Sequence, residues 1–168
     1  MRLFTNIETR ANMAFELIAR QLGCSKLIAP LVRSGSFDGG EMTLRYMEKR
    51  RFFSRIYKLE ITLEISSLEA PYGKAYWKSG THWTGDHAVS DWFAQHPQLS
   101  RLSSLIDIEM ASYRREDSDS SATVQLVTLP GCFIWTLVPP MHYFVKLNGK
   151  EIDGLSRLLG QRLDTTLA

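Results

Sequence analysis

Alternating apolar and polar residues form the clearest pattern in the chain. From Tyr57 to Ile65 every second residue is apolar, and the residues between them are Lys58, Glu60, Thr62 and Glu64. A period of two predicts a strand with one buried and one solvated face. A similar alternation runs from Met42 to Tyr46, so the two segments predict neighbouring antiparallel strands.

Three other segments, 11–23, 86–97 and 148–163, place apolar residues three and four apart, which is typical of amphipathic helices. In the last one, Asn148 is followed three residues later by Glu151, the pattern of a capping box. The other predicted helix ends are a cap at Thr9 or Asn12, a stop at Gly23, a cap at Asp86 and a stop at Pro97.

The chain carries no Asp, Glu, Lys or Arg from Ala122 to Val145, a stretch long enough to cross a bilayer. Pro130-Gly131 is a turn signal inside it, so we predict a buried hairpin of strands 122–129 and 132–138 and no membrane span. Shorter strands are predicted at 74–79 and 106–110, with another strand or extended arm at 143–147. Residues 34–40 have the composition of a loop.

These elements occur in the order helix, three strands, helix, two or three strands, helix. Because short connections favour antiparallel pairing, the sequence predicts an α+β fold: a mainly antiparallel sheet of five to six strands with helices packed on one face. A chain of 168 residues is long enough for one core, so we expect residues 1–168 to form a single domain.

The composition, 44% hydrophobic and 23% charged, is that of an ordinary globular protein and excludes a disordered or collagen-like chain. Only Cys24 and Cys132 are present, too few for a disulfide scaffold, and we expect two buried free thiols. No apolar run of signal-peptide length follows Met1, which favours a cytoplasmic protein.

Positive charge is concentrated between Arg45 and Lys58, where six basic residues accompany one acid, Glu48. Together with Phe52 and Phe53, this basic stretch has a composition found in nucleic-acid-binding proteins, where cations meet phosphates and rings stack on bases. The alternative is a hairpin tip whose charges are solvated and whose two rings are tucked into the core. We favour the hairpin tip and do not expect a nucleic-acid partner.

Motifs for phosphate loops, dinucleotide binding and zinc proteases are missing from the sequence, so no catalytic residue, metal ligand or cofactor is predicted. The densest group of titratable side chains is His82, Asp86, His87 and Asp91. This group has the composition of a catalytic or metal site, to which His96 or His142 could be added by the fold. It equally fits an ordinary capped surface helix, which we favour.

Large aromatic residues crowd the segment 72–83. Exposed rings give large contact area at little entropic cost, so such a segment can mark a ligand pocket or a partner surface. We favour core packing for at least half of these rings and take the loop of His82 and Trp83 as the best candidate for a functional edge. The predicted binding residues are Tyr76, Trp77, His82, Trp83, Asp86 and His87. A protein partner is expected there, and a homodimer is left open.

The run Leu129-Pro130-Gly131, then Pro139-Pro140 and residues 143–147 before a leucine-rich helix, resembles a bacterial family classed as domain of unknown function 3156. The resemblance covers roughly residues 13–163 and implies no activity and no site residues. The order of elements is also similar to that of small bacterial secretion chaperones, dimers that wrap an effector segment, although those chaperones are usually acidic.

The sequence therefore predicts a protein of uncharacterised activity, a non-enzymatic protein-binding or chaperone-like module. Two alternatives stay open. One is a small-molecule-binding protein or enzyme with its site near the 81–92 loop, and the other is nucleic-acid binding through the 45–58 basic stretch.

Overall fold

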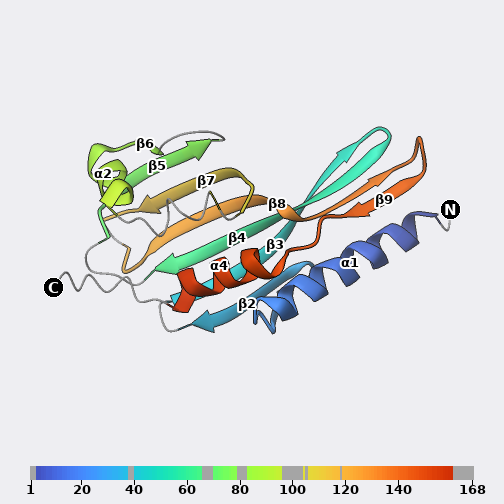
Figure 1. The fold of residues 1–168 in the computed structure, drawn as a ribbon, viewed down its shortest axis with the longest axis horizontal. Coiled ribbons are helices and arrows are strands. Elements are labelled where there is room, and N and C mark those ends of the chain that lie inside the picture. Colours follow the sequence, from blue (N-terminus) through green and yellow to red (C-terminus); the bar gives the residue numbers. More distant parts are fainter. Residues whose placement is uncertain are drawn as a thin grey trace.

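The computed structural model describes residues 3–37, 40–65, 70–78, 83–95, 104, 106–117 and 119–160. Figure 1 shows an elongated molecule built on one twisted sheet. The helices are α1 (Leu3–Gln21), α2 (His87–Gln95) and α4 (Gly149–Gly160). The strands are β1 (Lys26–Ala29), β2 (Val32–Phe37), β3 (Gly40–Arg51), β4 (Ser54–Ile65), β5 (Gly73–Lys78), β6 (Trp83–Gly85), β7 (Ile108–Arg115), β8 (Ala122–Thr136) and β9 (Met141–Phe144).

The sheet is antiparallel throughout, with the order β1-β2-β3-β4-β8-β7-β5-β6, and β9 pairs with β8. The predicted α+β class is confirmed, but the sheet has nine strands rather than five to six. The predicted order is also wrong, because six strands precede α2.

The extra strands include β2, which covers most of the segment predicted as a loop. β2 pairs with β3 through its backbone, so its small residues do not prevent a strand. A side chain at Gly35 would start 2.8 Å from the carbonyl oxygen of Gly23, so glycine lets the end of α1 approach the strand closely.

β8 is one continuous strand where the sequence predicted a hairpin. Its first part pairs with β4 from Ala122 to Thr128, and pairing resumes at Phe133 on the far side of an irregularity. Gly131, with φ +88°, lies in this irregularity beside a proline that has no N–H to offer a ladder. The turn residues thus bend the strand instead of reversing it, and β7 gives way to β9 as the second neighbour of β8 at the bend.

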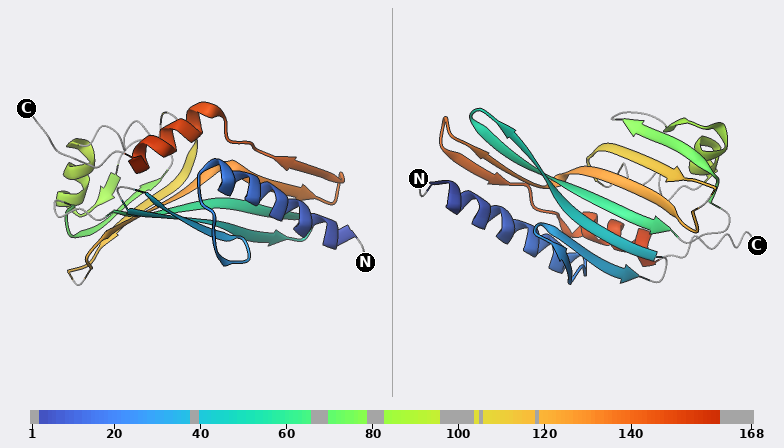
Figure 2. Two further views of the ribbon diagram at one scale, coloured as in Figure 1. Left: turned by 90° about the horizontal axis from the view of Figure 1, so that it is seen from below. Right: turned by 180° about the vertical axis from the view of Figure 1, so that it is seen from behind.

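The three helices lie on one face of the sheet, as predicted (Figure 2). The ring of Phe15 on α1 packs 4.9 Å from that of Tyr46 on β3, and the ring of Phe93 on α2 packs 5.4 Å from that of Tyr113 on β7. α1 begins before the predicted cap because Ile7 extends its buried stripe. It ends, as predicted, before Gly23, which has φ +72°.

The opposite face of the sheet carries no helix among the described residues. Cross-strand ion pairs lie along it, from Arg45 to Glu60 at 3.0 Å and from Lys58 to Glu109 at 2.5 Å. No helix in the described part of the chain is both long and apolar enough to cross a membrane.

Candidate functional site

The aromatic segment predicted as a binding site forms β5, β6 and the start of α2, at one end of the molecule. Trp77 and Trp83 are cross-strand partners, and both pack against the hydrophobic core. The Trp83 ring also stacks on Phe93, with the ring centroids 3.8 Å apart and the planes at 5°. The stacking of Trp83 on Phe93 thus holds α2 on the sheet.

Asp86 and His87 lie at the start of α2. The Asp86 carbonyl accepts hydrogen bonds from the amides of Val89 and Ser90, at 3.1 and 3.0 Å. Its carboxylate accepts a hydrogen bond from the Lys74 amide at 2.8 Å, which joins the helix start to β5. His87 is exposed. The predicted cap is thus placed as expected, but its carboxylate is engaged in a structural contact.

Tyr76 points away from these residues. It lies on the face of the sheet without helices, and its side chain is exposed beside the β7 strand. His82 and His96 lie outside the described residues, and His142 contacts Arg10 at 2.8 Å at the other end of the molecule. Among the side chains that the structure describes, no three His, Cys, Asp or Glu residues form a group that could hold a metal ion.

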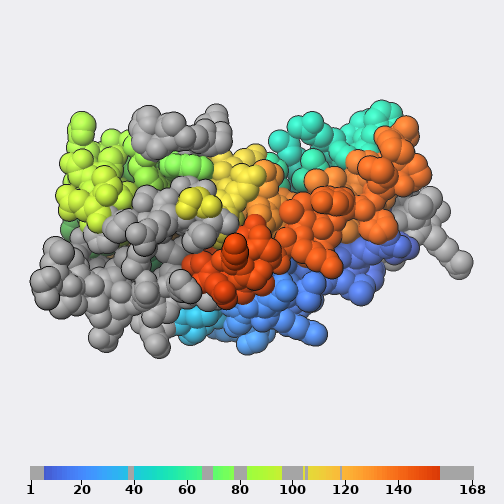
Figure 3. Space-filling view, viewed as in Figure 1, coloured from blue at the N-terminus to red at the C-terminus, as the bar shows by residue number. Residues whose placement is uncertain are grey.

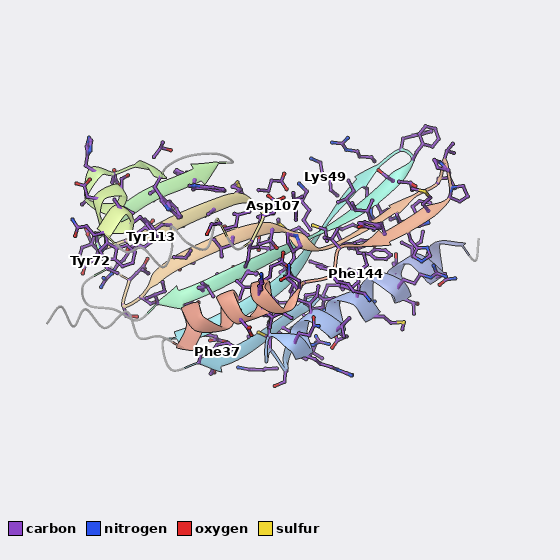
Figure 4. The ribbon with its side chains drawn as sticks, viewed as in Figure 1. Phe37, Lys49, Tyr72, Asp107, Tyr113 and Phe144 are labelled. Atoms are coloured by element: carbon purple, nitrogen blue, oxygen red, sulfur yellow. The ribbon has the colours of Figure 1, made fainter. Side chains whose placement is uncertain are left out.

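A second candidate surface lies at the opposite end, where two hairpins project side by side (Figures 1 and 3). We call residues 48–57 and 134–144 the paired tip. The turns of the two hairpins are joined by a hydrogen bond from the Leu137 amide to the Phe53 carbonyl at 2.8 Å. Ser54 and Thr136 are cross-strand partners just behind it. Figure 4 shows Lys49 and Phe144 toward this end and Tyr72 and Tyr113 toward the other.

Apolar side chains are unusually exposed on the paired tip. It carries six of the fourteen exposed large hydrophobic residues in the described part of the chain: Phe52 (91% exposed), Phe53 (53%), Leu137 (40%), Val138 (71%), Met141 (56%) and Tyr143 (64%). The Phe52 and Phe53 rings meet edge to face at 4.6 Å. Clustered exposed apolar side chains are typical of interaction sites.

The exposure of the two phenylalanines overturns the expectation that their rings are tucked into the core. The hairpin tip itself is as expected, since β3 and β4 pair up to Arg51 and Ser54. That register leaves Phe52 and Phe53 as the two turn residues, beyond the last paired position. The helices cover the body of the sheet and leave these rings in solvent.

Basic residues surround the apolar cluster. The paired tip holds Lys49, Arg50, Arg51 and Arg55 against one acid, Glu48, a net charge of +3. Glu48 accepts hydrogen bonds from Arg50, at 2.9 Å, and from the Tyr57 hydroxyl, at 3.3 Å. The hydrogen bond from Arg50 and the nearby guanidinium groups lower the pKa of Glu48.

Lys49 and Arg51 are both exposed and make no ion pair with any residue that the structure describes. They alternate along β3 with Glu48 and Arg50, so their side chains leave from the face that carries no helix. On the other face of the sheet, Arg50 pairs with Glu48 and Arg55 pairs with Glu48 and with Glu8 of α1, so the positive charge outside described ion pairs lies on the face without helices.

Sequence reasoning missed the half of the paired tip that belongs to β8 and β9. The lack of Asp, Glu, Lys and Arg from Ala122 to Val145 predicts a buried hairpin and gives no indication of an exposed end. The available signal was the double proline, Pro139-Pro140, flanked directly by Val138 and Met141. A turn bordered by large apolar residues rather than polar ones presents those residues to solvent.

Comparisons with known proteins give one finding. A family model with the description "Protein of unknown function" matches residues 20–165, which is most of the chain. No curated protein and no solved structure matches it. The paired tip therefore has to be interpreted from its own chemistry.

Proposed function

Since the chain belongs to the family Protein of unknown function (DUF3156), as its sequence resemblance suggested, and no activity comes with that family, we propose a function from the structure. The protein is a non-catalytic binding module that attaches to a partner through the paired tip. The carrying observation is the clustering of exposed apolar side chains on the tip, with Phe52 as the most exposed of them. Burying such a side chain contributes about 1.5–3 kcal/mol to association.

The arrangement of the tip supports this proposal. The two turns are joined by the hydrogen bond between Leu137 and Phe53, and the hairpins behind them belong to the central sheet. A surface that is already ordered binds at a smaller entropic cost than a disordered loop.

The predicted site at the other end gives a catalytic role less support than the paired tip gives a binding role. Trp77 and Trp83 are used in packing, and the Asp86 carboxylate is used in joining α2 to β5. Tyr76 is the exposed ring of the group and lies on the opposite face of the sheet. The free buried thiols Cys24 and Cys132 are in keeping with the cytoplasmic location that we propose.

The proposal is tested by placing a photoreactive phenylalanine at single positions and irradiating cells that express the protein. Phe52 is the test position and Leu27, an exposed apolar residue of β1, is the control. We expect one dominant adduct from position 52 and none of the same mass from position 27. Equal labelling from both positions, or no adduct from either, would contradict a binding role for the tip.

A further inference from the structure

We propose that the partner of the paired tip is the surface of a membrane rich in anionic lipid, to which the protein attaches without spanning it. This inference rests on the proposed function and names the partner of the same surface. It is carried by two independent features of the tip, its apolar end and its basic flanks.

The apolar end has the shape and composition needed for shallow insertion. Phe52 and Val138 are the two most exposed apolar residues of the tip and lie in adjacent turns, which a backbone hydrogen bond holds together. The two turns close the hairpins at one end of the elongated molecule (Figure 1), so this end can approach a flat surface. Peripheral proteins bury such apolar groups at the boundary between headgroups and acyl chains.

Tyr143 and Met141 extend the apolar end along β9. Both are more than half exposed and follow the second turn directly. Tyrosine is enriched at membrane interfaces because its ring is apolar and its hydroxyl remains in contact with water. No acidic residue occurs in 134–144, so nothing on this hairpin repels a negative surface.

The basic flanks match the charge of an anionic headgroup layer. Lys49 and Arg51 precede Phe52 in the same hairpin and are free of ion pairs with described residues, so their charge is available to a partner. Long basic side chains lie along an interface with their stems in apolar surroundings and their charges at the headgroups. Each such residue near an anionic surface strengthens binding about fivefold, equivalent to about 1 kcal/mol.

A fluid surface also explains why the tip is convex. A protein partner would need a pocket fitted to two adjacent turns, whereas a bilayer accepts a protruding apolar group of any shape. Single-stranded nucleic acid is bound by stacking on ring faces, but three of the six exposed apolar residues of the tip, Leu137, Val138 and Met141, have no ring to offer.

The experiment is flotation of the full chain with vesicles of phosphatidylcholine and phosphatidylglycerol, and in parallel with vesicles of phosphatidylcholine alone. We expect flotation with the anionic vesicles, a large decrease as sodium chloride is raised, and little flotation with phosphatidylcholine. Phe52→Ser should weaken binding about tenfold. The double variant Lys49→Gln and Arg51→Gln should weaken it about 25-fold.

Matched controls come from β1, where Lys26 and Leu27 are an exposed basic and an exposed apolar residue away from the tip. Lys26→Gln and Leu27→Ser should float as the parent protein does. Circular dichroism melting of every variant identifies any loss of folding.

Equal binding to neutral and anionic vesicles, no binding to either, or unchanged binding of the tip variants would overturn the lipid assignment. A position-52 adduct that is a protein, found together with absent flotation, would overturn the lipid assignment while leaving the binding role of the tip in place. Suppose that the protein bound a single-stranded oligonucleotide and no vesicles, and that the same tip variants lost this binding. That result would also overturn the lipid assignment and leave the binding role of the tip in place.

Discussion

Tyr46 joins β3 to the bend of β8 through one buried hydroxyl. Its ring packs between Phe15 and Tyr57, and its hydroxyl donates a hydrogen bond to the Gly131 carbonyl at 2.5 Å. Burial, together with the neighbouring Cys132 thiol, raises the pKa of Tyr46. The hydroxyl is thus kept in its donating form at the point where the ladder between β4 and β8 is interrupted.

Tyr46→Phe is expected to lower the free energy of unfolding by about 1–3 kcal/mol, because the buried Gly131 carbonyl loses its donor. Urea denaturation followed by tryptophan fluorescence measures the change. Tyr143→Phe, on an exposed residue, is the matched control and should have no effect. A Tyr46→Phe variant as stable as the parent would show that the hydrogen bond adds nothing to stability.

At the scale of elements, α4 and β4 could be predicted from the sequence and β8 could not. Asn148 and Glu151 form the predicted capping box, with reciprocal hydrogen bonds of 2.6 and 3.0 Å between backbone and side chain. The capping-box signal is local, because the residues from Asn148 to Glu151 are sufficient to form it. Pro130-Gly131 suits both a turn and a bend, and the choice is made by β4, a strand distant in sequence.

The candidate site was only partly predictable for a related reason. The basic hairpin was expected, because its alternation and charges are local features. Whether Phe52 and Phe53 face the core depends on where the helices end relative to the turn, which no local pattern states. The stacking of Trp83 on Phe93 likewise joins a strand to a helix face, so it depends on how the elements pack and is not contained in a local sequence pattern.

Gly131→Ala tests the bend of β8. A Cβ at this position would lie 2.5 Å from a Leu59 methyl carbon, and φ +88° is unfavourable for alanine. We expect the free energy of unfolding to fall by about 2–4 kcal/mol, measured by chemical denaturation.

Gly149→Ala is the control for this substitution, since nothing lies within 4 Å of a Cβ at that position. It should change stability by less than about 0.5 kcal/mol. If both alanine variants were equally stable, the bend would not depend on glycine.

At the scale of the whole molecule, the sheet separates two different ends. The end around α2 is closed by stacked and edge-to-face rings, including Trp92 with Phe93 at 5.0 Å. The paired tip is open and apolar. Buried weak acids occur away from the tip: burial raises the pKa of Cys24, behind α1, and of Tyr113, beneath α2, each to about 12.

These raised pKa values predict sensitivity to alkali. The unfolded chain releases the Cys24 proton near pH 9 and the Tyr113 proton near pH 10, whereas the folded protein keeps both up to about pH 12. Because the unfolded state loses protons first, stability should fall as the pH rises from 9 to 12, by up to about 1.4 kcal/mol per pH unit for each group.

Urea denaturation at several pH values measures this fall. Cys24→Ala should give a shallower decrease between pH 9 and 10 than the parent protein, because one of the two buried thiols whose pKa is raised, Cys24 and Cys132, is gone. The same slope in both proteins would assign the alkaline loss to other residues.

The position of β8 at the centre of the sheet has a consequence for synthesis on the ribosome. The hairpin of β3 and β4 is complete once Ile65 has emerged, but its partner Ala122 is made much later. At about 5–20 residues per second, the long edge of β4 stays without its neighbour for several seconds. Lys58 and Glu60 in the middle of that edge are suited to this interval, because charges on a waiting strand discourage pairing with another nascent chain.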